Sequence, residues 1–241
     1  MFRRIYSPVL LCAGLLISTM ASATINPFND DFEGYLDTNP DALAGSGWLV
    51  FANVFDGVSG NYLYGYGPFP APNDGGGFSG VSVGEGGAEQ GAQQLNTFSD
   101  YNNSTEHGNG NPVESLVFVE QTITTANVGQ TWTFRFDAKL GNLEGATTAE
   151  AFLKTLDPNA GFAETNLVTQ ETTTTPVTWS TYELTLTIDA GLVGQVIQFG
   201  FSNTASNFEG SGVFYDNVDF FPDFSILEFS DDFESYIDTD P

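Results

Sequence analysis

The stretch Thr131-Trp132-Thr133-Phe134-Arg135-Phe136-Asp137 decides the fold class. Its aromatic residues alternate with polar ones, so in an extended chain the aromatic side chains lie on one face and the polar side chains on the other. A sheet with one buried and one wet face is typical of a two-layered β-sandwich. We therefore expect this stretch to form a strand that packs on one side only.

Comparable strand patterns recur along the chain. Runs rich in Thr, Val, Phe and Tyr alternate with clusters of Gly, Asn, Asp and Pro, and helix signals are almost absent. The sequence thus predicts an all-β protein. The clearest predicted strands span residues 114–124, 130–140, 149–156, 178–188, 196–202 and 213–220.

Residues 57–111 differ in composition, being dense in Gly, Asn, Ser and aromatic residues. Long loops in a compact domain are usually functional or disordered, and the aromatic residues favour order because disordered segments contain few of them. We expect long ordered loops here.

The N-terminus has the features of a secretory signal peptide over residues 1–23. Arg3 and Arg4 supply positive charge, residues 9–17 form a short apolar run, and Ala21-Ser22-Ala23 supplies the small-residue cleavage site. We expect export to the periplasm, the cell surface or the medium. No later run approaches the roughly 20 consecutive apolar residues of a membrane helix, so no membrane insertion is expected after cleavage. The single cysteine, Cys12, lies inside the predicted signal, which leaves no disulfide in the mature chain.

Cleavage after residue 23 leaves 218 residues with 3 basic and 31 acidic side chains, a formal charge of −28. Such a surface repels nucleic acid phosphates and attracts divalent cations. Nucleic acid is therefore not an expected partner. The length suits one large sandwich module, which we place at residues 24–228.

One internal repeat is present. Residues 29–40 (Asn-Asp-Asp-Phe-Glu-Gly-Tyr-Leu-Asp-Thr-Asn-Pro) match residues 230–241 (Ser-Asp-Asp-Phe-Glu-Ser-Tyr-Ile-Asp-Thr-Asp-Pro) at 8 of 12 positions. Repeats at a long period indicate modular arrays. We predict that residues 229–241 begin a second, truncated repeat of the module. The alternative is a C-terminal strand that resembles the first one.

The two ends of the predicted module carry a family resemblance. It opens with Asn29-x-Asp31-Phe32-Glu33, continues to Gly47-Trp48, and closes with Phe214-Tyr215-Asp216-Asn217-Val218. This frame resembles galactose-binding-like jelly rolls, especially carbohydrate-binding modules of the CenC type. Two positions depart from the usual pattern, Asp31 standing for a Gly and Asn217 for an Asp. The resemblance implies a jelly-roll β-sandwich of two antiparallel sheets that binds a polysaccharide or cell-surface glycan without catalysis.

The same resemblance implies a structural calcium ion held by Asp31, Glu33 and Asp216. The first and last strands of such jelly rolls are neighbours, so their carboxylates can converge on a hard cation that relieves their mutual repulsion. The alternative is that these residues are ordinary exposed acids.

Two groups of side chains are candidates for carbohydrate binding. Tyr62, Tyr64 and Tyr66 alternate, which in an extended segment places the three rings on one side, and flat rings suit the apolar faces of sugars. The alternative is that these rings pack a loop against the edge of the sandwich.

The second group contains every basic residue of the mature chain, namely Arg135, Lys139 and Lys154. All three fall on what reads as one β-hairpin, where they could receive a carboxylate or sulfate of an anionic polysaccharide. The alternative is an internal ion-pair network with the nearby acids Asp137, Glu144, Glu150 and Asp157.

Catalytic signals are few. The single histidine, His107, stands beside Glu106 without the spacing or the second ligand of a zinc site, and no nucleophile elbow or phosphate-binding loop occurs. We predict no catalytic residue and a non-catalytic binding module. A structural or adhesive repeat without sugar binding is the first alternative, and a polysaccharide lyase or hydrolase is the next, since this type of sandwich serves many functions.

Overall fold

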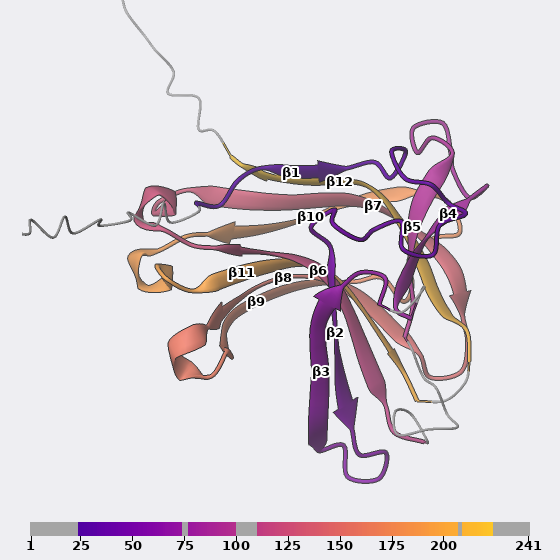
Figure 1. The fold of residues 1–241 in the computed structure, drawn as a ribbon, viewed down its shortest axis with the longest axis horizontal. Coiled ribbons are helices and arrows are strands. Elements are labelled where there is room, and N and C mark those ends of the chain that lie inside the picture. The colour runs from indigo at the N-terminus through magenta and orange to yellow at the C-terminus, as the bar shows by residue number, and fades with distance from the viewer. Residues whose placement is uncertain (1–23, 74–76, 100–109, 207–208, 224–241) are drawn as a thin grey trace, which may run out of the picture.

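The computed structural model describes residues 24–73, 77–99, 110–206 and 209–223. The predicted signal peptide (1–23), the predicted second repeat (229–241) and His107 lie outside the described residues. The described part is a jelly-roll β-sandwich of two antiparallel sheets (Figure 1), as the sequence predicts.

Sheet A has the strand order β10-β7-β12-β5-β4, and β1 also pairs with β12. Its strands are β1 (Phe28–Asp30), β4 (Ser79–Val83), β5 (Gln93–Thr97), β7 (Thr131–Leu143), β10 (Ser180–Thr187) and β12 (Ser211–Pro222). Sheet B has the order β3-β2-β6-β11-β8-β9. Its strands are β2 (Leu49–Phe55), β3 (Tyr62–Pro70), β6 (Val113–Thr122), β8 (Thr148–Asp157), β9 (Ala163–Glu171) and β11 (Val196–Ala205).

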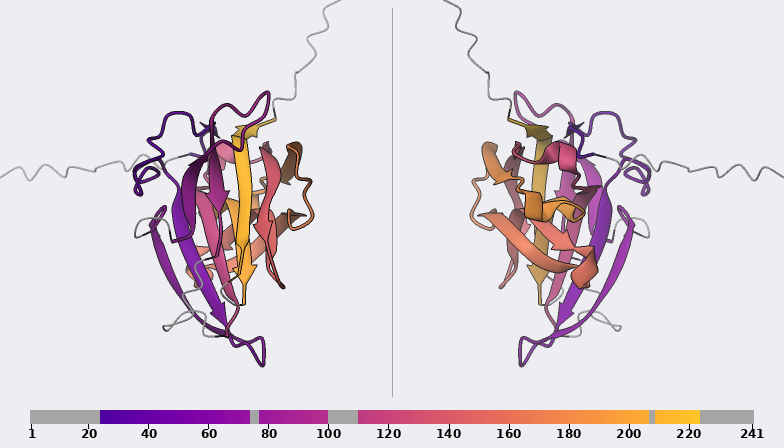
Figure 2. Two further views of the ribbon diagram at one scale, coloured as in Figure 1. Left: turned by 90° about the vertical axis from the view of Figure 1, so that its right-hand side faces the viewer. Right: turned by 90° about the vertical axis from the view of Figure 1, so that its left-hand side faces the viewer.

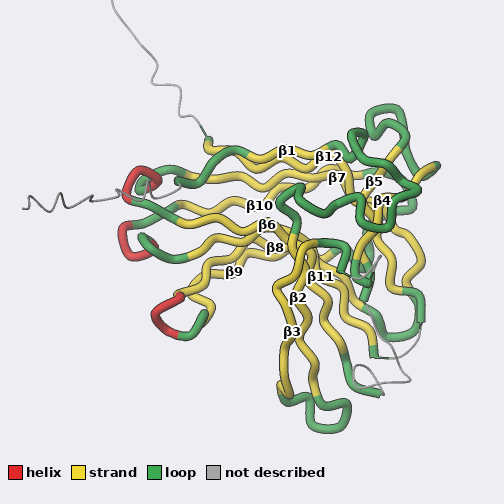
Figure 3. The backbone as a smooth tube through the Cα atoms, in the orientation of Figure 1, coloured by secondary structure: helices red, strands yellow, loops and turns green. Residues whose placement is uncertain are grey.

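Three single turns of 3-10 helix lie together at one end of the sandwich (Figure 3): η1 (Thr125–Asn127), η2 (Pro158–Ala160) and η3 (Ala190–Leu192). The turn between β2 and β3 projects from the bottom of the molecule in Figure 1 and in both views of Figure 2. All six strands predicted most clearly are confirmed, as β6, β7, β8, β10, β11 and β12.

The core fills the space between the sheets. Trp132, Phe134 and Phe136 of β7 are almost completely buried, which confirms that the aromatic face of this strand packs in the core. The expectation that the other face is wet is wrong in part, because Thr133 and Asp137 are also buried. Sheet B contributes Phe199 and Phe201 of β11 to the core, and both are fully buried. Burial of aromatic side chains is the largest single source of hydrophobic stabilisation in such a core.

Stacked rings join the two sheets directly. Phe201 stacks on Tyr215 with 3.6 Å between ring centroids, and Phe199 stacks on Phe220 with 4.1 Å. The hydroxyl of Tyr215 lies 2.7 Å from that of Thr172, so its one polar atom has a partner inside the core.

The two ends of the module lie side by side, because β1 pairs with β12 and Phe28 is opposite Phe220. At the end of β1, the carboxylate of Asp30 accepts hydrogen bonds from the Phe32 amide (2.9 Å) and the Tyr35 hydroxyl (2.6 Å). It also accepts one from the indole N–H of Trp48 (2.9 Å). The first two bonds hold the turn after β1 in shape, and the third ties this segment to Trp48, the residue before β2 of sheet B.

The expectation of long loops over residues 57–111 is wrong for much of that segment. It contains β3, β4 and β5, and β5 pairs with Val213, Phe214 and Tyr215 near the start of β12. β4 and β5 are short and lack the alternation that identifies a strand from sequence, whereas the Gly and Pro residues of β3 favoured a loop. Within the residues that the structure describes, no helix has the length and apolar character needed to cross a membrane.

Candidate functional site

The outer face of sheet B, turned away from the core, carries an apolar row across four strands. Leu49 pairs with Phe118, Phe118 with Gly200, and Gly200 with Phe152. Phe118 and Phe152 pack together with Leu116, Leu49 and Phe51 in a cluster separate from the main core. An apolar cluster on the outside of a sheet serves no purpose for the core between the sheets.

Gly200 gives this row its shape. A Cβ atom at this position would lie 2.2 Å from the carbonyl oxygen of Val117 and 2.8 Å from Cβ of Phe118. Such contacts are too short for any real side chain. The glycine therefore allows the backbone of β6 at Val117 and Phe118 to approach β11 closely at the centre of the row.

A groove of about 610 Å³ lies over this face. Its most exposed rings are Tyr62, on the edge strand β3, and Phe162, just after the η2 turn, each with 57% of its surface exposed. Both rings line the same groove, together with Phe51, Lys154 and Gln198.

Phe162 reaches the groove with an unusual backbone. Its φ of +63° lies in the left-handed region that favours glycine, and a non-glycine residue held there costs about 1–3 kcal/mol. The preceding Gly161 is also left-handed, and the Phe162 amide donates to the Asp157 carbonyl at 2.8 Å. Core packing does not explain this strain, because the ring is largely exposed.

Polar side chains lie along one side of the apolar row. Gln198 pairs with Glu120 on β6 and with Lys154 on β8, and its amide donates to the Glu120 carboxylate at 2.7 Å. The ammonium group of Lys154 lies 4.5 Å from the ring centroid of Phe152, so it covers part of the apolar floor.

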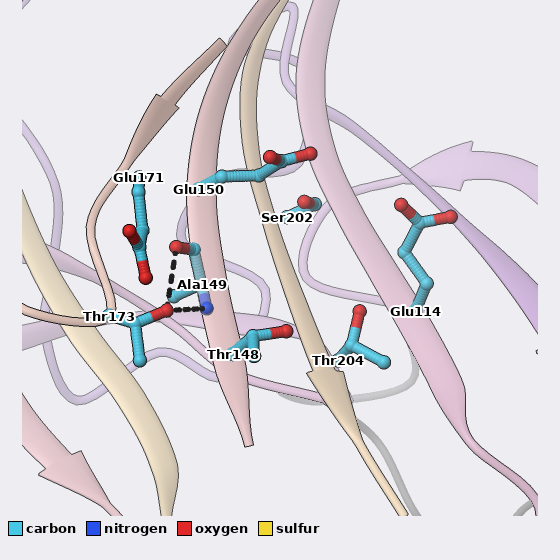
Figure 4. Close-up of a pocket in the computed structure, with 8 residues that line it drawn as sticks. All are labelled: Glu114, Thr148, Ala149, Glu150, Glu171, Thr173, Ser202 and Thr204. Atoms are coloured by element: carbon cyan, nitrogen blue, oxygen red, sulfur yellow. Dashed lines mark hydrogen bonds between the residues drawn. The ribbon is translucent and has the colours of Figure 1, made fainter. Parts of the chain in front are cut away.

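Three carboxylates line a second hollow, of about 410 Å³, on the same face (Figure 4). They are Glu114 on β6, Glu150 on β8 and Glu171 on β9, and the hydroxyl groups of Ser202 and Thr204 on β11 lie between Glu114 and Glu150. Ser202 pairs with Glu150 and Glu150 with Glu171, so these side chains follow one line across the sheet.

Burial and like charge determine the electrostatics of this hollow. Burial raises the pKa of Glu150, and the carboxylate of Glu114 raises it further, while Lys154 opposes both effects. Burial lowers the pKa of Lys154, while the neighbouring carboxylates, led by Glu114, act in the opposite direction. The face as a whole is negative around a single cation.

The expectation that Tyr62, Tyr64 and Tyr66 share one side is wrong. A register shift between β2 and β3 places Tyr62 opposite Phe55, on the outer face, but Tyr64 opposite the buried Val54. Tyr64 and Tyr66 pack against the main core. A β-bulge reverses the alternation of side chains, and no sequence signal marked it here. Only Tyr62 lines the groove.

The expectation that Arg135, Lys139 and Lys154 lie on one hairpin is also wrong. Arg135 and Lys139 are on β7 in sheet A, whereas Lys154 is on β8 in sheet B. β7 and β8 are consecutive but cross from one sheet to the other. The three cations therefore do not converge on one anion.

Arg135 and Lys139 are instead engaged in ion pairs. Arg135 pairs with Asp219, and Lys139 pairs with Glu85 at 2.8 Å while also donating to the Glu85 carbonyl at 2.9 Å. The alternative of internal ion pairs is thus confirmed for these two cations, although with partners other than the four acids expected.

Asp216, a predicted metal ligand, is fully buried beneath loops on the outer face of sheet A. Its Oδ1 accepts a hydrogen bond from the Asn217 amide at 2.6 Å, whereas Oδ2 has no hydrogen-bond partner. Burial raises the pKa of Asp216 to about 7, although the Asn217 hydrogen bond opposes this rise. The negative charges of Asp137, Glu33 and Asp31 raise it further, in that order.

The other two predicted ligands lie near Asp216, since their charges act on it. Oε1 of Glu33 accepts hydrogen bonds from the amides of Ala92 and Gln93, each at 2.7 Å, and Oδ1 of Asp31 accepts one from the Glu33 amide at 3.2 Å. Among the described residues no group of three or more His, Cys, Asp and Glu side chains is arranged as a metal site.

Sequence reasoning missed the aromatic groove of sheet B. In the segment Leu116-Val117-Phe118-Val119 both faces of the strand are apolar, because one face meets the core and the other forms the outer row. Without alternation, the outer residues could not be told from core residues.

Comparisons with known proteins give a fold likeness at low identity. No known family profile and no curated protein matches the sequence. Among solved structures, a "CBM4 structure and function" chain is 18% identical with a TM-score of 0.36, covering 84% of this chain and 97% of that one. A cyclase from Fischerella sp. TAU is 13% identical with a TM-score of 0.44, covering 81% of this chain and 96% of that one. The enzymatically active domain of Bacteriophage CBA120 tailspike protein 4 is 12% identical with a TM-score of 0.43 over 78% of this chain. The present chain spans only 21% of the tailspike chain.

Proposed function

We propose that the protein is an exported, non-catalytic carbohydrate-binding module whose binding surface is the groove on the outer face of sheet B. The observation that carries this proposal is that two exposed rings, Tyr62 and Phe162, line one groove. Sugar rings present apolar C–H faces and a rim of hydroxyl groups. Aromatic side chains bury the faces, and amides and carboxylates hydrogen-bond the hydroxyls.

The charge of this face favours an uncharged glycan. Four carboxylates, those of Glu114, Glu120, Glu150 and Glu171, lie along the groove and the adjoining hollow, against the single ammonium of Lys154. Uronic acids and sulfate esters would be repelled by this surface. The anionic polysaccharide considered for the three basic residues is therefore not the ligand that we propose.

Binding to a panel of soluble neutral polysaccharides and their oligosaccharides, measured by affinity electrophoresis and calorimetry, tests the proposal. We expect Tyr62→Ala and Phe162→Ala each to weaken binding about tenfold or more, because burial of an aromatic side chain contributes about 1.5–3 kcal/mol. Phe69→Ala is the matched control, since Phe69 is on the same edge strand as Tyr62 and 42% exposed but does not line the groove. Equal losses in all three variants, or no binding by the wild-type protein, would contradict the proposal.

We further propose that calcium stabilises the fold at Asp216, with Glu33 and Asp31 as further ligands. A cation that binds only the folded state raises the unfolding temperature by mass action. Thermal unfolding with excess calcium and with a chelator should differ by several degrees in the wild-type protein and not in Asp216→Ala. An unchanged unfolding temperature of the wild-type protein would remove the calcium site and leave the groove proposal standing.

One observation favours a second function, polysaccharide cleavage. Glu150, whose pKa is raised, lies in the same hollow as Glu114 and Glu171, and paired carboxyl groups with different pKa values serve glycosidases. Reducing-end assays on any polysaccharide that binds would detect cleavage. Loss of that cleavage in Glu150→Gln, with binding retained, would establish an enzyme in place of a binding module.

A further inference from the structure

The segment that precedes and follows β1 occupies a seat on the sandwich, which we define as the surface that contacts residues 24–36. Ile25 is 3% exposed and Phe32 is fully buried. Phe28 packs edge-on against Trp48, with 5.6 Å between centroids, and also contacts Phe199. The seat thus binds a small number of apolar side chains at defined spacings.

Polar contacts add to this recognition. Asp30 accepts hydrogen bonds from Tyr35 and Trp48, and Glu33 accepts the amides of Ala92 and Gln93. Each of these contacts uses a particular carboxylate at a particular position of the segment. A peptide that carried the same residues at the same spacing could make the same contacts.

Residues 225–241 contain the same residues at the same spacing. Aligned without gaps, residues 24–40 and 225–241 are identical at 10 of 17 positions. The identical positions include the residues with buried or half-buried side chains other than Thr24, and Glu33: Ile25, Phe28, Asp30, Phe32, Glu33 and Tyr35 correspond to Ile226, Phe229, Asp231, Phe233, Glu234 and Tyr236. Asn26, which Leu227 replaces, bonds Gln121 through its backbone N–H and carbonyl, which any residue other than proline supplies. Apart from Thr24, which Ser225 matches in kind, the differing positions are all exposed in the first copy. Similarity confined to exposed positions would show nothing, whereas this pattern retains the contacts.

We propose that the seat on one copy of the chain also binds residues 225–241 of a second copy, in exchange for its own residues 24–40. Occupation within the same chain is disfavoured. Since Phe28 is opposite Phe220, Phe229 of the same chain would reach that register only through a two-residue turn at Phe224-Ser225. Such turns require Gly, Asn or Asp. A head-to-tail exchange between copies has no such restriction, and it joins successive copies into open chains.

The test uses the mature chain, residues 24–241, with Phe32→Ala and Phe233→Ala, so that neither segment carries the buried ring. A synthetic peptide of residues 225–241 should raise the unfolding temperature of this variant by several degrees in a saturable manner. The same peptide with Phe233→Ala should not. Equal effects of the two peptides, or no effect of either, would overturn the proposal. If the alanine variant does not fold, Phe32→Leu in its place gives the same comparison.

The oligomeric state provides a second test. With Phe32→Ala alone, sedimentation should show species larger than a monomer that increase with protein concentration, and added Phe233→Ala should abolish them. A monomer at every concentration in both variants would contradict an exchange between copies.

Discussion

The adjacent residues Asp30 and Asp31 are expected to differ sharply in their contribution to stability. The Asp30 carboxylate accepts the Phe32 amide, the Tyr35 hydroxyl and the Trp48 indole N–H. Asp31 is exposed on the same segment and accepts a single bond, from the Glu33 amide. The test is the pair of variants Asp30→Ala and Asp31→Ala.

The magnitude follows from the contacts. A hydrogen bond to a charged group contributes about 1.5–3 kcal/mol to stability, and a buried donor left without a partner costs about 1–3 kcal/mol. Asp30 is half-buried, so we take the low end, about 1.5 kcal/mol, for each of the three bonds and expect Asp30→Ala to lose about 4–5 kcal/mol of unfolding free energy. Surface substitutions usually change it by less than about 0.5 kcal/mol, and we expect that of Asp31→Ala.

Urea denaturation in the presence of a chelator is the appropriate assay, because any bound cation would add its own dependence on Asp31. Trp48 provides a local signal, since it donates to Asp30 and stacks on Phe201 with 6.1 Å between centroids. If the two variants unfold at urea midpoints equal within error, the proposed role of Asp30 in fixing the N-terminal segment is wrong.

Three further predictions concern the sheets. Burial raises the pKa of Glu150 above its ordinary value of 4.5, so the folded state holds this proton more tightly than the unfolded chain. As pH rises above about 4.5, ionisation of Glu150 therefore lowers the free energy of unfolding. Glu150→Gln removes this ionisation, so its urea midpoint should fall less with rising pH than the midpoint of the wild-type protein. Gly200→Ala should lower the unfolding temperature by several degrees, because the added Cβ would meet backbone atoms of β6. Gly80→Ala is the control and should not lower it, because Gly80 has open space around it. Equal effects of the two substitutions would contradict a close approach of β6 to Gly200. Tyr215→Phe leaves the buried Thr172 hydroxyl without its partner and should cost about 1–3 kcal/mol in urea, and a neutral result would show that this hydroxyl finds another partner.

Residues with one buried face were the ones that could be predicted. Alternation over residues 131–137 identified β7 and its buried rings, and the motif at Phe214-Tyr215-Asp216 marked the last strand correctly as a neighbour of the first. These patterns are local, because period-2 alternation is a property of a strand that packs on one side.

Other features depended on contacts between distant segments. β4 and β5 carry no clear alternation, and β3 contains Gly and Pro that favour a loop. These segments form strands because β2 pairs with β3 and β12 pairs with β5. Lys154 lies on a different sheet from Arg135 and Lys139 because the chain crosses between the sheets after β7. The bulge in β3 turns Tyr62 outward and Tyr64 inward. None of these three features could be predicted from the local sequence of the residues concerned.

The sequence by itself thus determined the all-β class and the sandwich, because burial periodicity is a property of short stretches, and its resemblance to jelly-roll modules implied the pairing of the two ends. Only the tertiary structure decided which side chains meet. Phe162 and Tyr62 are 100 positions apart in the chain and line one groove, and of the adjacent acids Asp30 and Asp31 only the first meets Trp48. Sheet order, register and bulges, which arise from the packing of the whole chain, bring such residues together.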